Sequence, residues 1–216
     1  MTRFKICCIQ NADEARTAVA YGASALGFVS EMPSGPGPIP ESRITDIVPL
    51  VPPGVSTFLL TSKRDVQSII QQQRHTKANT LQLVDSVSIE TYKQLRSALP
   101  GIALVQVIHV RGHQSVDEAI SVAPYVDGVL LDSGNPDLPV KVLGGTGRVH
   151  DWKISRQIVE LSGKPVFLAG GLKAENVREA IRTVGPYAVD VCSGVRTNGL
   201  LDKKKLKNFV AALASG

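Results

Sequence analysis

The sequence predicts an α/β protein in which eight parallel strands, each followed by a helical segment, close into a (β/α)8 barrel. Three observations favour this fold. Short β-branched runs alternate along the chain with segments whose apolar residues recur at helical spacing, a pattern typical of parallel strands joined by crossover helices. Strands such as LVQVI, GVLLD and PVFLAG are almost continuously apolar, as expected when both faces of a strand are covered. The number of units, eight, is the number that closes a barrel.

The predicted strands are Arg3 to Cys7, Ala25 to Val29, Val55 to Leu60, Thr80 to Leu83, Ala103 to Ile108, Gly128 to Leu131, Pro165 to Ala169 and Ala188 to Val191. Helical spacing predicts helices at Ala12 to Tyr21, Arg64 to Gln73, Ile89 to Ala98, Val116 to Ala123, Glu175 to Val184 and Lys204 to Leu213. A Pro/Gly-rich stretch at 33–38 falls in the expected loop after the second strand, and no linker divides the chain. We therefore expect residues 1–216 to form a single domain, with an open doubly wound sheet as the alternative.

Composition and charge narrow the class of protein. The net charge is +5, but the basic residues are scattered and aromatic residues make up only 5% of the chain, so no nucleic-acid partner is expected. A modest positive charge also suits an anionic metabolite. No apolar run approaches the roughly 18 residues of a membrane span, and the N-terminus lacks the pattern of a signal peptide. We expect a cytoplasmic protein without a membrane partner, whose three cysteines are thiols.

In a barrel, the carboxyl ends of the strands surround one pocket, so residues at these ends are the candidates for chemistry. Glycine-rich segments follow the last two strands, where barrels commonly bind phosphate through backbone N–H groups. The candidates are Cys7, Cys8, Asp85, His109, Arg111, Asp132, Asp190, Cys192, Ser193 and Arg196, with the glycine-rich segments Gly144 to Gly147, Ala169 to Gly171 and Ser193 to Gly194.

Each candidate also has a structural interpretation. A cysteine at a strand end is more often a small buried apolar residue than a base. Asp132 would cap a helix or a turn, and Gly170-Gly171 would form an ordinary tight turn. Their joint placement at one end of the barrel is what favours a functional site.

The motifs together resemble one enzyme family, phosphoribosylanthranilate isomerase of tryptophan biosynthesis. The similarity runs in order from Lys5 to about Val195, nearly the whole chain. It is carried by Lys5-Ile6-Cys7, Gly22 to Val29, Leu130-Leu131-Asp132, Gly144 to Gly147 through Asp151-Trp152, Ala169 to Leu172 with Glu175-Asn176-Val177, and Val189 to Val195.

The resemblance implies a TIM barrel that performs an Amadori rearrangement of a phosphorylated sugar amine without a cofactor. It implies that Cys7 is the general base and Asp132 the general acid. Such a pair suits the reaction, since an acid opens the furanose ring and a base then removes a proton from the adjacent carbon. The resemblance further places Gly170, Gly171, Ser193 and Gly194 around the phosphate, and Asp190 at a ribose hydroxyl. We add Gly145 to the expected substrate-binding residues.

The chain departs from the family pattern at the substrate side of the site. Cys8 stands where the family usually has glycine, and Pro36 stands where an arginine normally pairs with the anthranilate carboxylate. Asp85 replaces a glycine, and Arg196 replaces an acidic residue. We therefore hypothesise that Arg111 or Arg196 supplies the missing positive charge.

Two alternatives remain open at this point. The barrel acts on a different amino-sugar phosphate with the same Cys7 and Asp132, or it is a catalytically silent phosphate-binding barrel.

Barrel closure separately predicts that Cys192 lies near Cys7 and Cys8. These thiols beside His109 or Asp85 offer a zinc alternative, but the spacing matches no recognised zinc motif, so inhibitory or oxidative thiol chemistry is favoured and no metal site is assigned. The expected partner is a small phosphorylated sugar substrate, and the expected state is a monomer or a homodimer.

Overall fold

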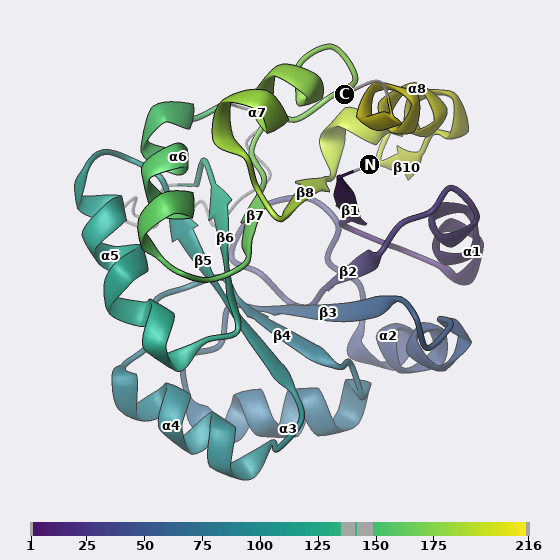
Figure 1. The fold of residues 1–216 in the computed structure, drawn as a ribbon. Helices are drawn as coiled ribbons and strands as arrows, with labels where there is room; N and C mark the ends of the chain where they lie inside the picture. The colour runs from purple at the N-terminus through teal and green to yellow at the C-terminus, as the bar shows by residue number, and fades with distance from the viewer. Residues whose placement is uncertain (1, 135–140, 142–148, 215–216) are drawn as a thin grey trace.

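The computed structural model describes residues 2–134, 141 and 149–214. Within them, eight parallel strands follow one another around a closed barrel in which β8 pairs with β1 (Figure 1). This closure confirms the barrel and excludes the open sheet. The strands are β1 Arg3–Ile6, β2 Ala25–Val29, β3 Ser56–Thr61, β4 Thr80–Leu83, β5 Ala103–His109, β6 Gly128–Asp132, β7 Val166–Leu168 and β8 Ala188–Val191.

Helices surround the barrel, as the view along its axis shows (Figure 1). They are α1 Ala12–Ala20, α2 Glu41–Ile47, α3 Val66–Thr76, α4 Ile89–Ala98, α5 Gln114–Val122, α6 Trp152–Leu161, α7 Val177–Val184 and α8 Lys203–Ala214. Six of these match the predicted helices, while α2 and α6 were not predicted. Two short strands, β9 Arg196–Thr197 and β10 Leu200–Leu201, form a hairpin after β8 that was not predicted either.

Alternation along the strands divides the apolar residues between two cores. In β1, Phe4 and Ile6 belong to the larger core, between barrel and helices, while Cys7 belongs to a smaller core with Phe58 and Val105. Because successive side chains point to opposite faces of a strand, Lys5 shares the side of Cys7. The interior of the barrel therefore receives Lys5 from β1 and Cys7 from the position just after it.

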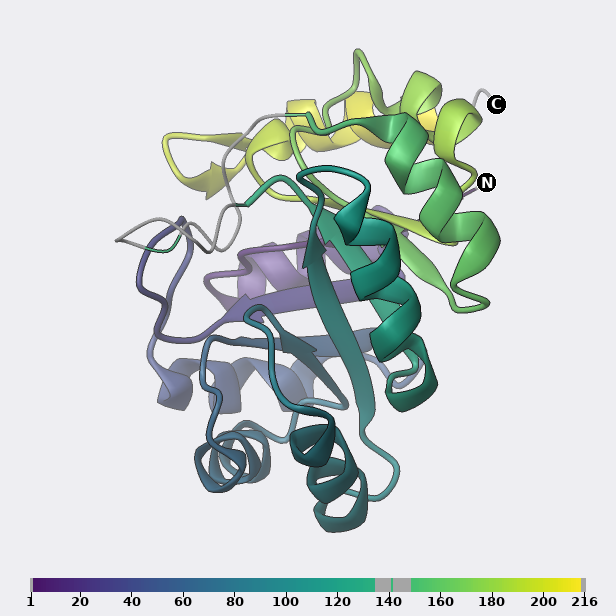
Figure 2. The ribbon, with the colours of Figure 1, turned by 90° about the vertical axis from the view of Figure 1, so that its left-hand side faces the viewer.

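Several loops gather at the carboxyl ends of the strands. The side view places the loop after β2 and the β9–β10 hairpin at the same end of the barrel (Figure 2). A parallel bridge between Val29 and Pro38 folds the loop after β2 back along its own strand. None of the helices in the described ranges is long and apolar enough to cross a membrane.

Candidate active site

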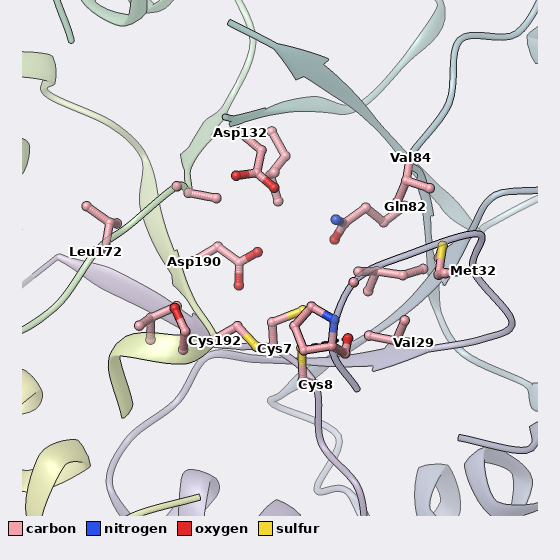
Figure 3. Close-up of a pocket in the computed structure, with 18 of the residues that line it drawn as sticks. Cys7, Cys8, Val29, Met32, Gln82, Val84, Asp132, Leu172, Asp190 and Cys192 are labelled. Carbon is pink, nitrogen blue, oxygen red and sulfur yellow. Dashed lines mark hydrogen bonds between the residues drawn. The ribbon is translucent and has the colours of Figure 1, made fainter. Parts of the chain in front are cut away.

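A pocket opens at the carboxyl ends of the strands, where the sequence places its candidates. Figure 3 shows Cys7 on one side and Asp132 on the other, with Asp190 and Gln82 directed into the space between them. The loop after β2 covers one side. Lining residues come from this loop and from the ends of seven strands: Cys7, Cys8, Val29, Met32, Ser34, Gly35, Pro36, Leu60, Gln82, Val84, Leu130, Asp132, Ala169, Gly170, Gly171, Leu172, Asp190, Val191, Cys192 and Ser193.

Cys7 directly follows β1, and its side chain is buried at the floor of the pocket. Its backbone N–H donates to the carbonyl of Val191 at 2.9 Å, which fixes the residue against β8. The pKa of its thiol is lowered, mainly by the adjacent Cys8 thiol; burial opposes this, and the Lys5 ammonium adds to the lowering. The site therefore favours the thiolate, the form in which cysteine acts as a base.

Asp132 ends β6 and faces the pocket across from Cys7. Burial raises the pKa of its carboxyl group, and the backbone N–H of Ser133, which donates to Oδ1 at 2.7 Å, works against this rise. A carboxyl group with a raised pKa keeps its proton to higher pH, as a general acid requires. The two candidate catalytic residues are thus shifted in opposite directions.

Asp190, on β8, lines the pocket beside Cys7. One carboxylate oxygen accepts a hydrogen bond from the Lys5 ammonium at 2.8 Å. The other oxygen, Oδ1, is buried and has no hydrogen-bond partner among the described residues. The side-chain oxygen of Gln82, on β4, is likewise buried without a hydrogen-bond partner among the described residues. These two buried oxygens therefore accept no hydrogen bond from the described residues, and the hydroxyl groups of a sugar are suitable donors for them.

The loop after β2 packs against Cys8. Cys8 has a φ of 64°, in the left-handed region, and its thiol donates a long 3.6 Å hydrogen bond to the carbonyl of Pro36 (Figure 3). The neighbouring Gly37 has a φ of 86°, and a Cβ added there would lie 2.5 Å from the Cβ of Cys8. The cysteine and the Pro/Gly-rich loop, two departures from the family pattern, therefore meet in space.

Arg196 does not reach the pocket, which corrects its expected role as a substrate-binding residue. Its guanidinium is buried and donates to both carboxylate oxygens of Glu14, at 3.1 and 2.9 Å. It also donates to the carbonyls of Cys7, Cys8 and Gly199 at 3.2, 2.5 and 2.8 Å. Arg196 is thus occupied in holding the backbone behind Cys7 and Cys8.

The segments after β7 and β8 come together as the sequence predicts. Gly170, Gly171 and Ser193 line the pocket, and the two glycines have φ values of 83° and 64°. Gly194 adjoins a second hollow beside the first, and a Cβ added to it would lie 2.0 Å from the carbonyl oxygen of Leu172. The two loops can approach this closely only with glycine at position 194.

The remaining candidates lie around this pocket. The buried carboxylate of Asp85 pairs with Lys141, and His109, at the end of β5, makes a 3.0 Å hydrogen bond to the carbonyl of Val84. Arg111 is exposed just beyond β5, and its substrate contact stays a prediction. Gly145 lies outside the described residues.

Across the described ranges, no group of three His, Cys, Asp or Glu side chains is arranged to hold a metal ion, so the zinc alternative finds no ligand set.

Sequence reasoning missed two polar residues of the barrel interior, Lys5 and Gln82. Both were noted as parts of motifs, but neither was proposed for the site. Strand alternation was the available signal, since Lys5 has the same parity as Cys7 and therefore points inward.

Comparisons with known proteins point to one family. A family model described as N-(5'phosphoribosyl)anthranilate (PRA) isomerase matches residues 4–212. N-(5'-phosphoribosyl)anthranilate isomerase 2 of Methanosarcina mazei is 36% identical, over 96% of this chain and 92% of that protein. The crystal structure of phosphoribosyl anthranilate isomerase from Thermotoga maritima superposes with a TM-score of 0.84 at 29% identity, and the match covers all of both chains. Another solved structure is that of a phosphoribosyl anthranilate isomerase in complex with reduced 1-(o-carboxyphenylamino)-1-deoxyribulose 5-phosphate. It superposes with a TM-score of 0.83 at 27% identity, and the match covers all of both chains.

Proposed function

The chain belongs to the N-(5'-phosphoribosyl)anthranilate isomerase family, and on that premise we propose how its own residues carry out the reaction. The protein is an isomerase of tryptophan biosynthesis that converts N-(5'-phosphoribosyl)anthranilate to the corresponding 1-deoxyribulose 5-phosphate amine. The observation that carries the mechanism is the placement of Cys7 and Asp132 on opposite sides of one pocket.

The first step opens the ribose ring. Asp132, as the carboxylic acid, gives its proton to the ring oxygen, and the bond between this oxygen and C1 breaks. The nitrogen lone pair forms the C1=N bond, so the product is a protonated Schiff base. The raised pKa of Asp132 supports this role because it keeps a proton available for transfer.

The second step forms the enolamine. The Cys7 thiolate removes the proton from C2, the C–H electron pair becomes the C1=C2 double bond, and the C=N pair returns to nitrogen. Tautomerisation then places a proton on C1 and removes the enol proton from O2, so the product is an isomer of the substrate. The opposite pKa shifts of Cys7 and Asp132 both increase the fraction of molecules with the acid protonated and the base deprotonated.

Other residues position the substrate. We propose that the unpartnered Oδ1 of Asp190 accepts a hydroxyl of the sugar, while Gly170, Gly171, Ser193 and Gly194 surround its phosphate. The apolar wall formed by Met32, Pro36, Leu60 and Val84 suits the aromatic ring of a carboxyphenylamino group. These steps require no cofactor.

The assay follows the loss of phosphoribosylanthranilate fluorescence. Cys7→Ala and Asp132→Asn are each expected to lower kcat by at least about 100-fold, because each removes a proton-transfer group. Asp46→Asn, at an exposed carboxylate on α2, is the matched control and should retain native turnover. Turnover that survives both active-site substitutions would refute the mechanism. A native protein without turnover would instead favour a different amino-sugar phosphate or a silent barrel.

The cellular setting is part of the same proposal. A biosynthetic isomerase with a small phosphorylated substrate fits the cytoplasm and needs neither a nucleic-acid nor a membrane partner. The state remains a monomer or a homodimer; one solved relative at 25% identity is described as monomers generated from the dimeric enzyme of Thermotoga maritima.

A further inference from the structure

The most unusual buried group in the barrel is the ammonium of Lys5. The side chain is fully buried, and its nitrogen lies 2.8 Å from Asp190 Oδ2 and 5.3 Å from the centre of the Phe58 ring. A buried lysine loses its hydration, and burial alone would therefore favour the neutral amine. Because the β1–β8 register places Lys5 directly opposite Asp190, the ammonium has a carboxylate partner and remains charged.

Gly27 locates this charge relative to Cys7. A Cβ added to Gly27 would lie 2.9 Å from the sulfur of Cys7 and 3.0 Å from the nitrogen of Lys5. The ammonium and the thiol therefore lie on either side of one small space, within about 6 Å of each other, the range in which a charge shifts a neighbouring pKa. Glycine at position 27 keeps this space open.

We propose that Lys5 is a positioning residue for the isomerisation, whose buried ammonium stabilises the thiolate of Cys7 and holds the carboxylate of Asp190 toward the substrate. The inference rests on the proposed role of Cys7 as the base. Lys5 lies beneath the pocket and is absent from its lining, so it acts through Cys7 and Asp190.

The charges around Cys7 support the assignment. Among the described residues that line the pocket, the titratable groups besides Cys7 are Cys8, Cys192, Asp190 and Asp132, and none of these carries a positive charge. Burial is the largest single effect and lowers the pKa of Lys5, but the Asp190 carboxylate together with Cys7 and Cys8 raises it by more, so the pKa is raised overall and the ammonium persists across the working pH range. The effect of Lys5 in lowering the pKa of Cys7 exceeds the opposing effect of the Asp190 carboxylate.

The experiment titrates Cys7 directly. The chain has three cysteines, so Cys8→Gly with Cys192→Ala leaves Cys7 as the only thiol. In this background, the rate of iodoacetamide alkylation is measured against pH for Lys5, Lys5→Met and Lys5→Arg. Lys5→Met should move the midpoint up by about 1 to 2 pH units, and slow alkylation at neutral pH about tenfold or more. Lys5→Arg keeps the positive charge and should restore most of the native profile.

Activity and folding are measured on the same substitutions in the otherwise native chain. Lys5→Met should lower kcat by about tenfold or more, in line with the lost thiolate. If Lys5→Met does not fold, Lys5→Met with Asp190→Asn removes both charges from the interior and should still raise the midpoint, by a smaller amount. An unchanged alkylation profile in a folded variant would overturn the inference, because a purely structural ion pair would alter stability alone. Full turnover by Cys7→Ala would instead refute Cys7 as the base and leave the alkylation result intact.

Discussion

Cys8 shows what one side chain changes beside the proposed base. Its φ of 64° lies in a region that costs an ordinary residue about 1 to 2 kcal/mol but costs glycine nothing. The glycine that the family usually carries here suits this backbone, and the cysteine keeps the conformation because Arg196 holds the carbonyls of Cys7 and Cys8. The thiol of Cys8, which glycine would lack, contacts the carbonyl of Pro36 and lowers the pKa of Cys7.

Comparison of two substitutions isolates this backbone strain. Cys8→Ala removes the thiol and keeps a Cβ in the left-handed region, whereas Cys8→Gly removes both. We expect the glycine variant to be more stable than the alanine variant by about 1 kcal/mol in the free energy of unfolding, measured by urea denaturation. Equal stability would mean that the backbone at position 8 is not strained.

The β9–β10 hairpin is the element that holds the back of the site. Glu14, on α1, accepts from Arg196 and also from the backbone N–H groups of Gln10 and Leu201, at 3.1 and 2.9 Å. Both members of this ion pair are less than a tenth exposed. A buried pair that satisfies several backbone groups ties the hairpin to β1 and α1 at once.

Loss of this arginine should therefore cost stability. Arg196→Met keeps much of the volume but leaves the Glu14 carboxylate buried without its partner, and we expect the free energy of unfolding to fall by about 3 to 5 kcal/mol. Arg182→Met, at an exposed arginine on α7, is the control and should change it by less than about 0.5 kcal/mol. A raised KM for the substrate in Arg196→Met, with an unchanged free energy of unfolding, would instead show that Arg196 contacts the substrate.

At the same scale, sequence reasoning recovered most of the periodic elements but not all of them. The predicted strand β4 has the bounds observed, and α6 was missed although Ile154 and Ile158 lie on its buried face behind the capping residue Asp151. The helix α2 is different, because it is short and follows Pro40, which offers no side-chain cap. Local signals for that helix are weak, and packing on the barrel determines it.

For the whole molecule, the sequence was sufficient to predict that strand ends would meet, because closure of eight strands brings them to one pocket. The placement of Cys7 and Asp132 at this pocket was predicted in this way, whereas their catalytic roles come from the family resemblance; the inward direction of Lys5 was predictable from alternation. The direction of Arg196 was not, because it follows a strand end, and the fold of the hairpin beyond β8 decides which way its side chain points. The buried carboxylate of Glu14, distant in sequence, supplies the partner that no local pattern reveals.

The closure of the barrel also brings the loops after β7 and β8 together, and this contact supports the last prediction. Gly194→Ala would place a Cβ 2.0 Å from the carbonyl of Leu172, so the loops must separate and the proposed phosphate site must widen. Inorganic phosphate at 100 times its Kd should stabilise the native protein by about 2.7 kcal/mol, and Gly194→Ala should lose most of this gain.

Thermal unfolding with and without phosphate measures this stabilisation in the native protein and in Gly194→Ala. The KM for the phosphorylated substrate should also rise in Gly194→Ala, by about tenfold or more if one charge-assisted hydrogen bond is lost. Gly54→Ala is the matched control, because a Cβ there meets nothing within 4 Å. Phosphate stabilisation that persists in full in a folded Gly194→Ala variant would place the phosphate elsewhere. Loss of phosphate stabilisation with kcat retained would show that the loops after β7 and β8 anchor the substrate while Cys7 and Asp132, across the barrel, perform the chemistry.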